Sequence, residues 1–295
     1  MVIHMKKSQF EEIKKLAKHD ISAGVYKNRW KYLLCIPLVC IFFFNYCEQV
    51  NGFFENAPHA FEPSFMDFML YVFKGKIFTF IDNRTRYEIP FMWLTTQMMA
   101  LYIVGSYASD DRTRTGQQYL LRCTHTSSWY IGKMFYSIVS VGLFYLEICI
   151  LGFLFTVPFS KQVFTLHSDL ILMSTNIHIE RHTQLDIYRS VFVMPCLTAM
   201  VLGQMFIVLQ LVIKPSYSYI ASLFYILCSD YYPSSFLIGN YSMIVRNVQE
   251  NTEHGEVLTK CFDPVSGILL EISISILLIF LGKLILKKYD YLERE

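Results

Sequence analysis

Charged residues are scarce in this sequence of 295 residues. They make up 17% of the chain, whereas a soluble domain usually carries about 25%. Hydrophobic residues reach 54% and the mean hydropathy is +0.35, which disfavours an ordinary soluble globular domain. The net charge of +2 is too small to indicate binding to nucleic acid.

Motifs for nucleotide or metal chemistry are also missing. Gly132-Lys133 lacks the upstream glycine and the following Ser or Thr of a P-loop. The eight cysteines form no CxxC pair, and His178 and His182 have no evident third ligand. We therefore expect no catalytic residue, no metal site and no cofactor bound by this chain, and we do not expect an enzyme.

Six apolar blocks are present, and most approach the length of about 20 residues that a helix needs to cross a bilayer. A backbone in lipid must satisfy its own hydrogen bonds, so these blocks should be helices. The sequence predicts an all-α, polytopic membrane protein with six transmembrane helices. The blocks cover residues 30–47, 88–108, 130–158, 187–213, 217–231 and 265–286.

The distribution of Lys and Arg predicts the orientation. The segments on the side of the two termini carry 17 of these residues and those on the other side carry 9. This excess places both termini in the cytoplasm and predicts a multi-pass protein of the cell (plasma) membrane.

We expect a single transmembrane domain, 1–295, in three parts. A cytoplasmic leader helix covers 1–31, the six-span bundle covers 32–290 with a loop at about 106–133, and a short cytoplasmic tail covers 291–295.

The leader should form an amphipathic helix. Apolar residues recur at the spacing of one helix face, at Phe10, Ile13, Leu16 and Ala17. Lysines occupy the rest of the helix, at Lys14, Lys15 and Lys18. Such a helix can lie at the inner membrane surface with its lysines near anionic headgroups; alternatively, it is a basic flank that only sets the topology.

Two outer segments are apolar without being long enough to span the bilayer. Residues 64–80 predict a short helix that lies on the outer surface or dips into it. Residues 236–245 predict an interfacial or re-entrant piece, because they are too short to cross and are followed by Arg246.

The cytoplasmic loop between the second and third spans predicts a short helix over residues 115–123. Its Tyr119, Leu120 and Leu121 need cover, either from a binding partner or from the leader helix of the same chain.

These features together resemble the type-2 ABC transporter permease family, whose fold is shared by the ABCG-like exporters. The resemblance rests on Lys18-His19-Asp20-Ile21 in the leader, on the 112–133 loop with Gly116, Leu120-Leu121-Arg122, Trp129 and Lys133, on Phe236 to Tyr241 with Arg246, and on the last span from Gly282 to Asp290.

The resemblance implies partners. In that family the loop forms the coupling helix that docks on a separate P-loop ATPase subunit, which holds ATP and Mg. Two membrane halves are needed, so a second copy or a sister permease is expected. The corresponding coupling residues are Thr115, Gln117, Gln118, Tyr119, Leu120, Leu121 and Arg122.

A translocation path is the second implication, because the family lines it with the second and fifth spans. Thr95, Met99 and Tyr102 share one face of the second span, although on spacing alone such a stripe is more often packing. Glu147 lies near the middle of the third span, where a carboxylate faces a cavity or a partner; it either contacts substrate or makes a structural hydrogen bond. Glu271 lies near the outer end of the sixth span, and we expect it to snorkel or cap the helix.

The function expected from these features is the membrane subunit of an ATP-binding cassette transporter that exports a peptide, a lipid or a hydrophobic drug. The alternative is a non-transporting immunity or sensor protein of the membrane that binds a peptide or protein partner.

Overall fold

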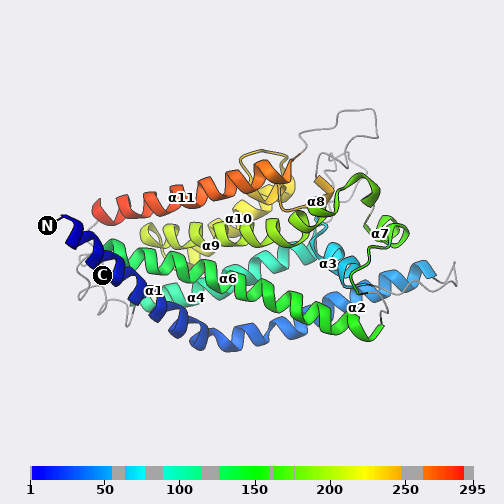
Figure 1. The fold of residues 1–295 in the computed structure, drawn as a ribbon, viewed down its shortest axis with the longest axis horizontal. Coiled ribbons are helices and arrows are strands. Elements are labelled where there is room, and N and C mark those ends of the chain that lie inside the picture. The colour runs from blue at the N-terminus through cyan, green and yellow to red at the C-terminus, as the bar shows by residue number, and fades with distance from the viewer. Residues whose placement is uncertain are drawn as a thin grey trace.

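The computed structural model describes residues 2–54, 64–76, 89–113, 126–159, 163–175, 177–246 and 262–288. These residues form an elongated bundle of helices, and no β-strand occurs among them (Figure 1). The prediction of an all-α fold is therefore confirmed for this part of the chain.

Four helical stretches are long and apolar enough to cross a membrane. They are Phe10–Asn51, Ser127–Phe159, Gln184–Val212 and Pro264–Lys288. The stretches coincide with the first, third, fourth and sixth apolar blocks of the sequence, which agrees with a membrane protein.

The other two blocks form shorter apolar helices. Helix α4 (Phe91–Thr113) is apolar only over Phe91–Gly105. Helix α10 (Pro215–Tyr231) has 17 residues, or about 26 Å at 1.5 Å per residue, which is less than a bilayer core of about 30 Å. Six complete spans therefore remain a prediction.

Helix α9 (Met194–Val212) is the central helix of the bundle. It packs against α4, α10, α6 (Thr126–Thr156) and α11 (Pro264–Lys288). Helices α6, α9 and α11 run lengthwise beside one another in Figure 1, and α1 begins at the end of the bundle where α11 finishes.

Helix α1 (Val2–Leu33) and helix α2 (Cys35–Phe54) are separated by a single turn residue, Leu34. Pro37 explains the interruption, because its ring cannot donate a hydrogen bond and clashes with the carbonyl of Leu33, four residues earlier. The leader is thus a nearly direct extension of the first span, and it packs along α6.

Helix α3 (Phe65–Phe73) is the short outer helix expected within residues 64–80. Ser64 and Asp67 form a capping box at its first turn, and all nine helical residues are buried. Its complete burial shows that α3 packs inside the protein; its position on the outer membrane surface or within it stays a prediction.

The remaining elements are short and connect the long helices. The π-helical turn η3 ends two residues before Pro195, which has no N–H to donate, so the wider turn accommodates the missing donor. These elements are η1 (Val157–Phe159), α7 (Ser168–Thr175), η2 (Ile179–Arg181), α8 (Gln184–Tyr188), η3 (Arg189–Val193), η4 (Ile238–Asn240) and η5 (Ile244–Arg246).

Candidate functional site

The predicted coupling residues, Thr115 to Arg122, lie outside the described residues. Their two flanks are described: α4 reaches Thr113 on one side and α6 begins at Thr126 on the other. The candidate site is therefore built from the side chains of these flanking helices.

A buried polar cluster joins α1 to both flanks. The Lys133 ammonium on α6 lies 2.7 Å from Oδ1 of Asp20 on α1. The Tyr107 hydroxyl on α4 donates to the same oxygen over 3.0 Å. One carboxylate thus ties together α1, the second half of α4 and the first part of α6.

The cluster is charged and nearly dry, because Asp20 is 4% exposed and Lys133 is 1% exposed. The Lys133 ammonium also lies 4.5 Å from the ring centre of Tyr107 and 5.6 Å from that of Trp129. The second oxygen of Asp20, Oδ2, is buried without a hydrogen-bond partner among the described residues. A buried ion pair stabilises a fold when further hydrogen bonds satisfy its remaining lone pairs. Here the lone pairs of Asp20 Oδ2 have no such hydrogen bond among the described residues.

The inward face of α1 continues from Asp20 at four-residue spacing through Gly24, Asn28 and Tyr32. A Cβ on Gly24 would lie 2.2 Å from the Tyr136 ring, so only glycine allows this close approach. Asn28 Nδ2 donates to the Tyr136 hydroxyl over 2.8 Å and to a backbone carbonyl of α4 over 3.1 Å. The Tyr32 hydroxyl donates to a backbone carbonyl of α6 over 3.3 Å. The leader is therefore docked on the bundle by polar and small residues.

The residues predicted for a translocation path lie on two helices. On α4, Thr95 donates to a carbonyl of its own helix, Met99 packs against the core, and Tyr102 lies beneath the Lys31 ammonium at 3.9 Å. On α6, Glu147 lies within hydrogen-bond reach of the Cys35 thiol on α2. No hydrogen bond joins Glu147 to the α4 stripe in the described part of the chain.

The prediction that Glu271 snorkels or caps its helix is wrong. Glu271 is fully buried between α11 and α9, and Thr198 donates to its Oε1 over 2.5 Å. It therefore neither snorkels nor caps its helix, because it faces the neighbouring helix and not the bilayer. Gln97 on α4 likewise bridges helices, donating to the Tyr145 hydroxyl over 3.1 Å.

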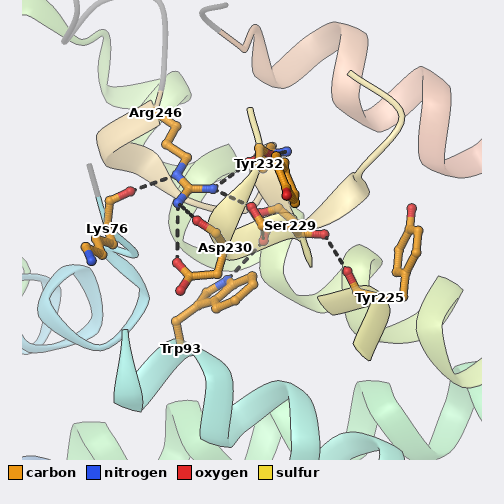
Figure 2. Close-up of polar contacts among 10 residues, drawn as sticks. Lys76, Trp93, Tyr225, Ser229, Asp230, Tyr232 and Arg246 are labelled. Atoms are coloured by element: carbon orange, nitrogen blue, oxygen red, sulfur yellow. Dashed lines mark hydrogen bonds and ion pairs between the residues drawn. The ribbon is translucent and has the colours of Figure 1, made fainter. Parts of the chain in front are cut away.

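Arg246 organises a second polar network, which includes the backbone of Lys76 just after α3. Its guanidinium donates to the carbonyls of Lys76 (2.7 Å), Ser229 (2.6 Å) and Asp230 (2.8 Å), to the Asn240 side chain (2.5 Å) and to Asp230 Oδ1 (3.3 Å), as Figure 2 shows for the labelled partners. Arg246 and Asp230 are both buried.

The segment leading to Arg246 is held inside the protein. Residues 238–246 are buried without interruption, and the Trp93 indole donates to the Ser242 hydroxyl over 3.0 Å. The segment is thus fixed to the bundle from residue 238 onward, and its interfacial or re-entrant position stays a prediction.

A pocket of about 250 Å³ lies beside this network, lined by the Lys74–Lys76 turn, α2, α3 and the start of α4. The Lys74 ammonium lies 4.5 Å from the Tyr71 ring, and the Tyr71 hydroxyl donates to Asn45 Oδ1 over 2.7 Å. Burial, and then the nearby charge of Glu48, raises the pKa of Tyr71, so its hydroxyl remains a neutral donor. The pocket combines cationic, aromatic and amide groups.

Comparison with known protein families, with curated proteins and with solved structures returns no match.

The sequence analysis did not single out Asp20, Lys133 or Asn28 as parts of a buried cluster. The signal was present, because polar and small residues at four-residue spacing in the leader would indicate a packed helix face. The identity of their partners, which are distant in sequence, could not be read from that spacing.

Proposed function

We propose that this chain is the membrane subunit of an ATP-driven exporter of the plasma membrane, energised by a separate P-loop ATPase that holds ATP and Mg. The exported molecule is a peptide, a lipid or a hydrophobic drug. A second copy or a sister permease completes the transporter.

The Asp20 cluster is the observation that carries this proposal. A segment that receives force from an ATPase must be attached to the bundle at both of its ends. Lys133 and Tyr107 belong to the two helices that bound the 114–125 segment, and both contact the same carboxylate of α1. Movement of that segment would therefore reach the leader and, through α2, the first span.

Other features support the proposal independently. Four helices could cross a membrane, the Lys and Arg excess favours cytoplasmic termini, and α1 starts at the end where α11 finishes (Figure 1). The sequence itself has no P-loop, so an energy-coupled chain of this kind needs a contact with an ATPase. Thr95, Met99, Tyr102 and Glu147 are the residues proposed for the path.

Co-purification from the native cell tests the proposal. We expect a P-loop ATPase to remain bound to the wild-type chain and to be lost from the Leu120→Asp, Leu121→Asp variant. Loss of a buried anchor costs about 2 kcal/mol or more, which is more than tenfold in affinity. The matched control is Leu185→Asp on α8, an exposed leucine, which should keep the ATPase. A double variant that still binds the ATPase and transports normally would remove this loop as the coupling element.

The outer pocket favours a second candidate, a sensor or immunity protein that binds a peptide or protein partner. Its lysines and aromatic rings suit an anionic or aromatic group of an external ligand. This candidate predicts that no ATPase co-purifies with the chain and that Lys74→Glu abolishes ligand binding. The exporter proposal predicts that an ATPase does co-purify.

A further inference from the structure

The outward side of α1 carries a groove that the proposed function does not use. It has a volume of about 520 Å³ and lies between α1 and the beginning of α6. Its lining is mostly apolar, with Phe10, Ile13, Ala17 and Ile21 from α1 and Phe135 from α6.

Two apolar residues of this groove are exposed, and Ile13, Ala17 and Ile21 are partly buried. Phe10 is 65% exposed and Phe135 is 48% exposed. Asp20 and Asn28, by contrast, point into the protein and are buried. Most exposed residues of α1 are polar or charged, among them Lys14, Lys15 and Lys18. A helix that carries lysines beside exposed apolar side chains is typical of the membrane interface, where the apolar side chains contact lipid and the lysines approach anionic headgroups.

Two lysines mark the rim of the groove. Lys14 and Lys18 line the groove and are exposed. Their i, i+4 spacing places their Cβ atoms about 5–6 Å apart on one helix face. No carboxylate is among the residues that line the groove. The site thus offers an apolar channel for a hydrocarbon chain and a pair of cations for one anionic headgroup.

We propose that this groove binds one anionic phospholipid, with an acyl chain along Phe10, Ile13 and Phe135 and the phosphate at Lys14 and Lys18. The lipid would fix the leader at the inner surface of the membrane. The proposal does not depend on transport, and it is tested on the purified chain without any ATPase.

Native mass spectrometry of the delipidated full chain measures the binding. Phosphatidylglycerol and phosphatidylcholine with identical acyl chains are the probes. We expect one phosphatidylglycerol to bind at least tenfold more tightly than phosphatidylcholine. In the Lys14→Gln, Lys18→Gln variant, phosphatidylglycerol should bind roughly 30-fold more weakly, the change given by about 1 kcal/mol per lysine near an anionic surface.

Two further variants distinguish lipid binding in the groove from nonspecific attraction between lysines and anionic lipid. Lys15→Gln removes an exposed lysine that is rotated about 100° around the helix from Lys14 and does not line the groove; it should bind like the wild type. Ile13→Gln keeps both lysines but places an amide in the groove, and it should weaken both lipids. Circular dichroism checks that each variant keeps its helices.

The proposal is overturned if the wild type binds the two lipids equally, or if Lys15→Gln weakens phosphatidylglycerol as much as the double variant does. It is also overturned if the chain forms a dimer without retained lipid that Ile13→Gln dissociates, because a second copy would then occupy the groove.

Discussion

Buried ion pairs lie at both ends of this molecule, and they are built differently. At the end near α3, Arg246 has five hydrogen bonds, three of them to backbone carbonyls. At the other end, Oδ1 of Asp20 receives both Lys133 and Tyr107, while Oδ2 has no partner among the described residues.

The two pairs also differ in how far apart their residues lie in the sequence. Asp230 and Arg246 are separated by 16 residues, so their contact fastens a local segment. Asp20 and Lys133 are separated by 113 residues, and with Tyr107 they join three helices. A fully satisfied polar network is rigid, whereas a pair with a spare acceptor can exchange partners. The Arg246 network, called the lock below, is therefore the more completely hydrogen-bonded of the two clusters.

The largest expected effect is at the lock. Arg246→Met should lower the free energy of unfolding by about 3–5 kcal/mol, because it removes one member of a buried ion pair. Denaturant unfolding in detergent measures the change. Arg189→Met is the control, because the Arg189–Asp186 pair is partly exposed and such pairs contribute about 0–1 kcal/mol. An Arg246→Met protein within 1 kcal/mol of the wild type would show that the lock does not stabilise the fold.

Asp20→Asn should have a smaller effect, about 1.5–3 kcal/mol, the range for losing a hydrogen bond to a charged group. Lys133 keeps its contacts with the rings of Tyr107 and Trp129, which limits the loss. If the exporter proposal holds, this variant should also uncouple ATP hydrolysis from transport.

Double variants sharpen the comparison between the two ends. Asp20→Leu with Lys133→Met should be more stable than either single variant, because replacing both members of a buried pair is often neutral. Arg246→Met with Asp230→Asn should remain destabilised, because three backbone carbonyls lose their donor. If both double variants regain the same free energy of unfolding relative to their single variants, the two clusters do not differ in how they stabilise the fold.

The sequence predicted the helices well because membrane helices are specified by local hydropathy. The block at 265–286, for example, corresponds to α11 at Pro264–Lys288. The short helix within residues 64–80 was also predicted, and it is α3. Its burial could not be predicted, because that depends on α2, α6 and α7 packing around it.

The candidate site was harder to predict, because the position of a residue along a helix does not reveal which neighbouring helix its side chain faces. Glu271 lies near the end of its block, yet it faces Thr198 and not the membrane surface. Asp20 and Lys133 were noted only as parts of a family resemblance, because nothing local indicates that residues so far apart form a pair.

Glu271 should respond mildly to substitution. Glu271→Gln keeps an oxygen for Thr198 and should leave the free energy of unfolding unchanged. Glu271→Leu removes the acceptor and should cost about 1 kcal/mol, since hydrogen bonds between membrane helices average about 0.6 kcal/mol with a maximum near 1.7. Unfolding in detergent measures both variants. A glutamine variant as unstable as the leucine variant would indicate that the carboxylate charge itself is required there.

Glu147 should give the smallest change in stability. It is only partly buried, and the thiol of Cys35 is its neighbour; a thiol is a weak donor. We therefore expect Glu147→Gln to unfold like the wild type. If the residue contributes to the path, the same variant should lower transport of the substrate while ATPase binding is kept. Glu180→Gln, an exposed glutamate of η2, is the control and should transport normally. Because leucine can neither carry charge nor accept a hydrogen bond, a fully active Glu147→Leu protein would exclude Glu147 from the path and leave it as a packing residue at the contact between α2 and α6.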